Sequence, residues 1–441
     1  MTTLGLVFCA IFFAALVLGG RRALVLAIAA SVPFNDSIAA SVGGLGGAPY
    51  FAGVALYVAA TLWVRFRDRK NLVFGYGDGS PNLLAGFYFY AVAVTLIAPT
   101  VFAGIGVMAS GIGLDEQVGA LTPLTYTPSN VAQIGYLTLS TLFVLFNEAD
   151  QYVTRQYFVI VFTVGILVAL ATDMLGMHDF FRSLFDNSAR GQYATNTIRL
   201  RGQFAEPSHL GAFSMCAVVY FGTAVTQVKT LRGLAAALTM LGLSGYALAR
   251  SASGTGIVGL VITACIIGAL AVVVVLAIPT SPRTIAFTGA YLLAGLILVP
   301  FAIPWARQIM SQKQDSTSSI TRQFADDNGW HLMTDTIIGT GLGSNRTSSM
   351  FYLLISTVGL LGTALFVAMV VRSIARGLHR AETLPTAFAL LAFVTTAFVS
   401  IADFASPLLW SLIAGCYAAN RLGAEPAGEH RDQPESVATR P

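Results

Sequence analysis

The chain has 441 residues, of which 55% are hydrophobic and only 10% are charged, and its mean hydropathy is +0.72. This composition leaves too little polar surface to cover a soluble globule, so it excludes an ordinary water-soluble domain. The net charge of +4 is small, and in a membrane protein the placement of Lys and Arg along the chain is more informative than their sum. The sequence therefore predicts an all-α, polytopic helical bundle in a membrane.

Apolar runs long enough to cross a hydrocarbon core of roughly 30 Å predict about 12 to 13 transmembrane helices. The predicted spans are 3–20, 22–42, 47–64, 82–100, 130–147, 156–175, 207–227, 233–249, 255–278, 284–303, 350–371, 384–402 and 407–420. Together they make a single transmembrane helical domain over residues 1–423. The segment 424–441 is polar and is expected to be a disordered cytoplasmic tail, because it cannot bury enough apolar surface to fold.

Basic residues recur in alternate short loops, which the positive-inside rule places in the cytoplasm. These basic loops contain Arg21-Arg22, Arg65–Lys70, Arg155, Lys229 with Arg232, Arg283, and Arg372–Arg380. The loops between them then face outward, and the long ones lie at about 101–129, 176–206 and 304–349, with short ones at 250–254 and 403–406. Residues 101–110 are apolar and Gly-rich, which predicts a re-entrant or interfacial segment. The loop at 304–349 is expected to carry an amphipathic helix on the membrane surface.

Charged side chains gather at the predicted outer face, most densely in the segment Arg199–Gly211 ahead of a long apolar run. The basic members of this face are Arg199, Arg201, His209, Arg250, Arg307, Arg322, His331 and Arg346. Because a guanidinium matches phosphate oxygens bidentately, arginines converging from several loops predict a diphosphate site. The alternative is that each arginine snorkels or pairs with a nearby Asp, and for Arg307 and Arg322 the two interpretations stand level.

Two residues could act on a proton at this face. Glu206 precedes Pro207, so it could mark a helix start as a cap, accept a proton at the bilayer edge, or hold an arginine of the same segment in place. His331 is a second candidate base, for which an interfacial histidine is the simpler interpretation. The four cysteines lie inside apolar runs and are expected to act as small hydrophobic side chains. With no zinc spacing and no phosphate-binding loop in the sequence, neither a metal nor a cofactor is expected.

The stretch Gly339-Thr-Gly-Leu-Gly-Ser344 superficially matches a nucleotide-binding glycine pattern. No strand is predicted before it, so the dinucleotide interpretation fails on context. The pattern instead predicts a close-approach turn leading into the helix at 350. Arg346 would then lie beside a helix N-terminus, where unpaired amides favour an anion.

Three motifs occur in a fixed order. They are Arg199-Leu-Arg-Gly202-Gln-Phe204-Ala-Glu-Pro207-Ser, Ala-Arg250-Ser-Ala-Ser-Gly, and Ile338-Gly-Thr-Gly341-Leu-Gly343-Ser followed by Leu353-Leu to Gly359-Leu-Leu-Gly362. In order and spacing they resemble the O-antigen ligase and O-antigen polymerase superfamily, over roughly residues 199–365. The resemblance implies a multi-pass glycosyltransferase of the GT-C type in the bacterial inner membrane. Its active face would be periplasmic, its donor an undecaprenyl-diphosphate-linked glycan, and it would need no metal or nucleotide sugar.

The resemblance also suggests roles for particular residues. It implies diphosphate binding by Arg199 or Arg201 and by Arg250, and Arg346 is added as a fourth candidate. Ligases of this family commonly carry a histidine just after the glycine turn, where this chain has Ser348, and the departure favours a polymerase that joins lipid-linked repeat units.

These observations predict the following site residues and partners. The catalytic candidates are Glu206 and His331, and the substrate-binding candidates are Arg322 and His209. The expected partners are the undecaprenyl-diphosphate-linked oligosaccharide donor and acceptor, the lipid bilayer and a chain-length regulator, without nucleic acid. One alternative is a ligase that transfers glycan to a lipid acceptor. The other is a glycolipid transporter or flippase whose path the arginines line.

Overall fold

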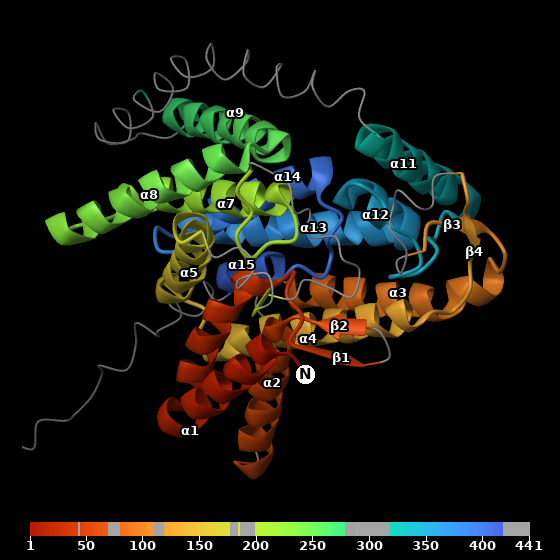
Figure 1. The fold of residues 1–441 in the computed structure, drawn as a ribbon, viewed down its shortest axis with the longest axis horizontal. Helices are drawn as coiled ribbons and strands as arrows, with labels where there is room; N and C mark the ends of the chain where they lie inside the picture. Colours follow the sequence, from red (N-terminus) through yellow and green to blue (C-terminus); the bar gives the residue numbers. More distant parts are fainter. Residues whose placement is uncertain are drawn as a thin grey trace, which may run out of the picture.

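The computed structural model describes residues 1–42, 45–68, 80–109, 119–176, 184–185, 199–277, 289 and 317–417 (Figure 1). The helices with their bounds are α1 Thr3–Ser31, η1 Val32–Phe34, α2 Pro49–Arg67, α3 Ser80–Val101, α4 Pro128–Asp150, α5 Arg155–Met174, α7 Pro207–Val225, α8 Leu231–Ser251, α9 Gly254–Ala277, α11 Thr317–Thr336, α12 Met350–Thr357, α13 Gly359–Leu378, α14 Leu384–Ser400 and α15 Pro407–Tyr417. The strands form two short antiparallel ladders, β1 Ala40–Val42 with β2 Leu45–Gly47, and β3 Gly106–Val107 with β4 Thr122–Pro123.

Eight helical stretches in the described part of the chain are long and apolar enough to cross a membrane. They are α1 continued by η1, α2, α3, α4, α5, α7, α8 and α13, and shorter apolar stretches lie in α9, α14 and α15. The prediction of an all-α polytopic membrane fold is therefore confirmed. The predicted span 284–303, Arg307 and the tail 424–441 fall outside the described residues.

The N-terminal apolar run departs from the prediction. Gly20, inside α1, has φ 69° and ψ −164°, so the chain reverses there instead of continuing as one straight helix. The Thr2 amide donates to the Ala39 carbonyl at 3.0 Å, which brings the start of α1 beside the segment that follows η1. The predicted turn near Arg21 is therefore correct. The predicted second span, 22–42, is wrong, because its helix ends at Ser31 and a polar segment follows.

One further prediction is corrected, and another stays open. The span 350–371 is broken into α12 and α13 at Gly359, whose φ of 63° is not helical. In the loop 101–129, β3 near its start pairs with β4 near its end, and Val107 packs in a cluster with Leu332 of α11. The described residues at 101–109 form no helix beyond Val101, and whether this segment is re-entrant or interfacial stays a prediction.

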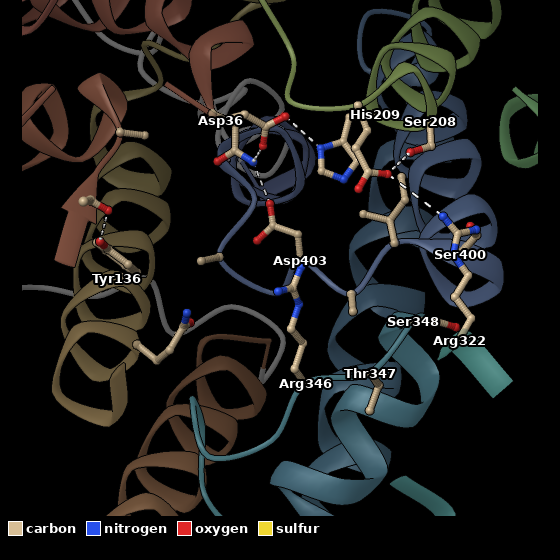
Figure 2. A pocket seen from close by; sticks show the side chains of 18 of the residues that line it. Asp36, Tyr136, Ser208, His209, Arg322, Arg346, Thr347, Ser348, Ser400 and Asp403 are labelled. Carbon is tan, nitrogen blue, oxygen red and sulfur yellow. Dashed lines mark hydrogen bonds and ion pairs between the residues drawn. The ribbon is translucent and has the colours of Figure 1, made fainter. Parts of the chain in front are cut away.

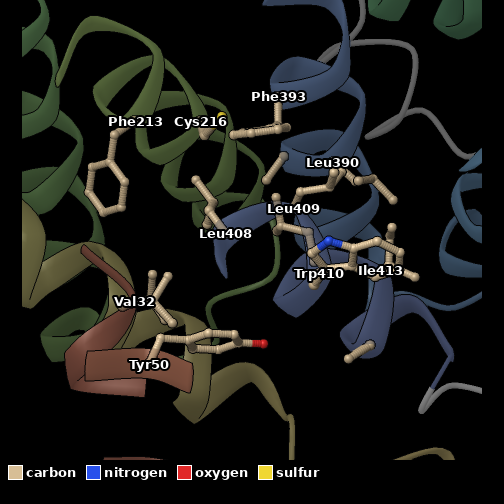
Figure 3. Close-up of a cluster of buried hydrophobic side chains, with 14 of the residues drawn as sticks. Val32, Tyr50, Phe213, Cys216, Leu390, Phe393, Leu408, Leu409, Trp410 and Ile413 are labelled. Carbon is tan, nitrogen blue, oxygen red and sulfur yellow. The ribbon is translucent and has the colours of Figure 1, made fainter. Parts of the chain in front are cut away.

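Helix α15 lies in the core of the bundle, and each of its described residues is buried. The described part of α15 has eleven residues, which at 1.5 Å per residue span about 16 Å. Neighbouring helices enclose it, and Figure 3 shows Trp410 and Leu409 of α15 among side chains of α7, α14 and α2. The Trp410 indole Nε1 donates to the Phe404 carbonyl at 3.0 Å, which satisfies its only polar atom in the core.

Glu206, Arg346 and Asp403, from three loops that were predicted to share one side of the membrane, line the same cavity at one end of this bundle. One cavity lies where α7 begins and α14 ends, and a second cavity lies where α7 ends and α14 begins. The 19 residues of α7 separate the two cavities by about 28 Å, close to the thickness of a hydrocarbon core. Which end faces outward stays a prediction.

Candidate functional site

A polar cavity of about 430 Å³ lies at the end of the bundle where α7 begins (Figure 2). It is built from segments far apart in the sequence: the turn after η1, the first turns of α4 and α7, one face of α11, the loop before α12 and the loop after α14. Its polar and charged lining consists of Asn35, Asp36, Gln133, Tyr136, Glu206, Ser208, His209, Arg322, Arg346, Thr347, Ser348, Ser400 and Asp403. Four of the residues predicted from the sequence are therefore brought together here.

The start of α7 follows from local sequence. Proline fixes a φ suited to the first turn of a helix and needs no amide partner there, so Pro207 begins α7. Glu206 takes the extended N-cap conformation, with φ −133° and ψ 151°. His209 lies within the first turn of the helix, facing the cavity. The helix thus presents Glu206 and His209 to the same space.

Asp36 and His209 form the central ion pair of the cavity. The His209 Nδ1 donates to Asp36 Oδ2 at 2.7 Å, and the Ala205 amide donates to the same oxygen at 2.9 Å. Burial alone would raise the pKa of Asp36, but the charge and hydrogen bond of His209 and the Ala205 amide outweigh it and lower that pKa below its usual value. Asp36 therefore stays ionised and fixes the orientation of the His209 ring.

Asp403 is a second carboxyl group in the same cavity. The Asn35 amide Nδ2 donates to Asp403 Oδ2 at 2.6 Å. Burial and the negative charge of Asp36 raise the pKa of Asp403, and the charge of His209 and the hydrogen bond from Asn35 only partly offset them. In Figure 2 the side chain of Arg346 extends into the cavity toward Asp403.

Glu206 and Arg322 line the open side of the cavity. Their closest atoms, Oε2 and Nη2, are 4.0 Å apart, and the two side chains are 50% and 41% exposed. The Ser208 hydroxyl donates to Glu206 Oε2 at 2.9 Å. Glu206 occupies the N-cap position of α7 but accepts no capping hydrogen bond from the helix, so the capping role does not account for its side chain. A half-exposed carboxylate beside an arginine can exchange that partner for a substrate group.

The loop that carries Arg346 is held by close packing. Gly343 has φ 77°, and a Cβ at this position would lie 2.7 Å from the Ser129 carbonyl oxygen. The Asn130 side-chain amide donates to the Leu342 carbonyl at 2.7 Å. On the other side, the Arg346 amide donates to the Met108 carbonyl at 2.9 Å. The predicted close-approach turn before the helix at 350 is therefore confirmed, and it sets the position of Arg346.

Ser348 is hydrogen-bonded to Asp326 of α11. Its amide donates to Asp326 Oδ1 at 2.9 Å, and its hydroxyl donates to Asp326 Oδ2 at 2.5 Å. Burial raises the pKa of the Asp326 carboxyl, and the hydrogen bonds from Ser348 only partly offset it. The hydroxyl already has an acceptor, so this contact joins α11 to the loop that carries Arg346.

Arg199 lies near the cavity without lining it. Its Nε donates to the Ser251 carbonyl at 2.9 Å. The pKa of Arg199 is lowered, chiefly by burial. The Glu206 carboxylate raises this pKa and the Arg322 charge lowers it, so Arg199 interacts electrostatically with both charged groups of the open side. Arg199 therefore adds positive potential to this end of the cavity.

Three predicted residues lie elsewhere. Arg201 is in the turn that precedes α7, outside the cavity lining. Arg250, at the end of α8, pairs with Asp173 at 3.1 Å. His331 is exposed on α11 and does not line the cavity. The structure thus does not bring Arg250 and His331 to the pocket that contains Glu206.

Sequence reasoning missed both carboxyl groups in the centre of the cavity. Asp36 was placed inside the predicted span 22–42, and Asp403 in a short outer loop to which no role was given. The sequence does contain a signal for Asp36. An ionisable residue inside an apolar span costs free energy in a membrane, so it marks a functional position by default. Its partner His209 is 173 residues away, so the pair itself leaves no mark in the spacing.

The arrangement can bind an anion and handle a proton. Arg322, Arg346 and the nearby Arg199 supply positive charge, and Glu206 offers a carboxylate at the open side. The fold and this cavity define a polytopic helical membrane protein with a charged pocket at one end of its bundle. In comparisons with known proteins, the chain matches no family model and no curated protein.

Proposed function

We propose that the protein is a GT-C-type glycosyltransferase that polymerises undecaprenyl-diphosphate-linked oligosaccharide repeat units on the periplasmic face of the inner membrane. The observation that carries the proposal is the cavity itself, which combines Arg322 and Arg346 with Glu206 at one end of a membrane-spanning bundle. A lipid diphosphate requires this combination at the membrane edge, because its tail stays in the bilayer while its charged head leaves it.

The reaction assigns a task to each group. Arg322 and Arg346, with Arg199 nearby, hold the diphosphate and stabilise the negative charge that grows as it departs. The acceptor sugar hydroxyl attacks the anomeric carbon of the donor, and the bond from that carbon to the diphosphate oxygen breaks with its electron pair. Glu206 takes the proton of the hydroxyl. His209, oriented by Asp36, donates a hydrogen bond to a substrate oxygen from its other ring nitrogen.

The transporter alternative receives less support from the charge distribution. A carrier path needs ionisable groups near the middle of the membrane. At the other end of the bundle, Asp150 at the end of α4 lies 2.8 Å from Arg21 and 4.0 Å from Arg65. This ion cluster lies at helix ends and not at mid-membrane depth, so it gives a carrier path no support.

The test is chain growth by the purified full-length protein on lipid-linked repeats, read as a ladder of polymer lengths. Glu206→Gln keeps the shape of the side chain and removes the base, so we expect chain growth to fall by roughly 100-fold or more while donor binding persists. Arg346→Gln is expected to weaken donor binding as well. Arg67→Gln, an exposed arginine at the end of α2, is the matched control and should retain wild-type growth.

Full chain growth by both Glu206→Gln and Arg346→Gln would refute the proposal. Arg250→Gln tests the resemblance separately, because Arg250 lies outside the cavity and pairs with Asp173. Loss of growth in this variant with retained folding would move the diphosphate site toward α8.

A further inference from the structure

A second cavity, of about 750 Å³, lies at the opposite end of α7 and α14 from the candidate site. It is enclosed by three loops, those between α4 and α5, between α7 and α8, and between α13 and α14. Its deep side is apolar, with Val153, Phe158 and Gly415 buried. None of the roles proposed above uses this space.

The rim of this second cavity carries more positive than negative charge. Arg155 and Lys229 line it from two different loops, and Glu382 is the one carboxylate among its lining residues. Within the described residues, neither Arg155 nor Lys229 forms an ion pair, whereas Arg21 and Arg65 at the same end are both held by Asp150. The two cations are exposed at the mouth and remain available to a ligand.

Helix ends of both signs also meet at this cavity. Thr154, Thr230 and Thr383 all line the cavity, and they are the N-cap residues of α5, α8 and α14. The same three loops also bring the C-terminal ends of α4, α7 and α13 to this space, and Gln151, the C-cap of α4, lines the cavity, so the helix dipoles there oppose one another. The excess positive charge of the cavity therefore comes from the side chains of Arg155 and Lys229.

We propose that this second cavity binds the phosphate-bearing headgroup of an anionic phospholipid. The phosphate meets Arg155 and Lys229 at the rim, and the adjoining acyl region packs on the apolar side formed by Val153 and Phe158. The position supports a lipid over a soluble phosphate, because the cavity lies about the length of α7 from the other membrane end and so at a membrane surface. This inference is independent of the glycosyltransferase proposal.

The experiment is native mass spectrometry of the full-length protein, titrated with phosphatidylglycerol, with phosphatidylcholine and with soluble glycerol phosphate. We expect phosphatidylglycerol to be retained preferentially. The double variant Arg155→Gln/Lys229→Gln should weaken it by about tenfold or more. Glu382→Gln removes the only carboxylate of the lining and should strengthen binding severalfold. Arg232→Gln is the matched control, because Arg232 is exposed at the same end without lining the cavity.

Three results would overturn the inference. Equal retention of phosphatidylcholine would show that the cavity does not select an anion. Equal binding of glycerol phosphate would assign the site to a soluble phosphate. An equal loss in Arg232→Gln and in the double variant would reduce the effect to general surface charge. Unchanged size-exclusion and thermal-unfolding profiles of the variants ensure that a loss reflects binding and not misfolding.

Discussion

The two carboxyl groups of the candidate site should respond to the same substitution in opposite directions. Asp36→Asn and Asp403→Asn each keep the size of the side chain and remove one negative charge. Asp36 is paired with His209 at 2.7 Å, whereas Asp403 is contacted by the neutral amide of Asn35. An asparagine at 403 can still accept the hydrogen bond of Asn35, so only the charge is lost there.

The directions follow from the pKa shifts. The pKa of Asp36 is lowered in the folded protein, so its contribution to stability is fully present above the unfolded value of about 4 and is lost as the pH falls through the folded value. The pKa of Asp403 is raised, so its ionised form costs stability at neutral pH, and that cost disappears as the pH falls through its folded pKa.

At pH 7 the expected changes in the free energy of unfolding have opposite signs for the two substitutions. Asp36→Asn removes a largely buried charged hydrogen bond and should destabilise the protein by about 2 kcal/mol. Asp403→Asn removes a carboxylate that burial and Asp36 disfavour, and should stabilise it by on the order of 1 kcal/mol. Thermal unfolding in detergent, followed by the fluorescence of the four tryptophans, measures both. When the same melts are repeated near pH 4, the stabilisation by Asp403→Asn should shrink, whereas the destabilisation by Asp36→Asn should largely persist and be lost only at lower pH.

The result that refutes this reasoning is a destabilisation by Asp403→Asn at pH 7 equal to that of Asp36→Asn. Such a result would mean that the negative charge of Asp403 is itself stabilising, through a cation such as Arg346. The burial of Asp403 would then no longer determine its preferred protonation state.

Two further substitutions test how the ends of the bundle are held. Gly343→Ala places a Cβ 2.7 Å from the Ser129 carbonyl oxygen at a φ of 77°, and should cost roughly 1–3 kcal/mol in chemical denaturation; an unchanged midpoint would contradict the close packing of this turn. Asp150→Asn leaves Arg21 without its partner at 2.8 Å and should lower stability by about 2 kcal/mol, whereas Asp68→Asn at an exposed pair should change it by about 0.5 kcal/mol or less. Equal effects of these two would mean that the partly buried cluster adds no more than a surface pair.

The helices could be predicted from the sequence because apolar runs bounded by proline, glycine and basic residues satisfy strong physical constraints. The prediction places the start of α7 at Pro207 and that of α14 at Leu384, where the structure has them. It fails at 22–42, because the mean hydropathy of the run conceals the polar segment Asn35–Ser37. A charge inside an apolar span is the better guide at such a position, and it would have singled out Asp36.

The candidate site could be predicted only in part, and the limit is physical. Each charged residue next to a helix end can be recognised locally, as Glu206 and Arg346 were. Which of them meet is decided by how the helices pack. Arg250 and Glu206 are closer in sequence than Glu206 and Arg346, but only the latter two line the same cavity. Spacing along the chain therefore indicates that a charge is at the membrane edge, without indicating its neighbours.

The irregular segment before α15 explains why a cavity exists at this end of the bundle. Irregular backbone is tolerated at membrane depth only where protein encloses it or where it lines a cavity. The segment between α14 and α15 is such a stretch, and Trp410 holds it in place by donating from its indole to the Phe404 carbonyl. Because α15 begins only at Pro407, the space above its first turn stays free for Asp403 and Arg346. A helix that began several residues earlier would fill that space, so the start of α15 at Pro407 is itself a condition for the site.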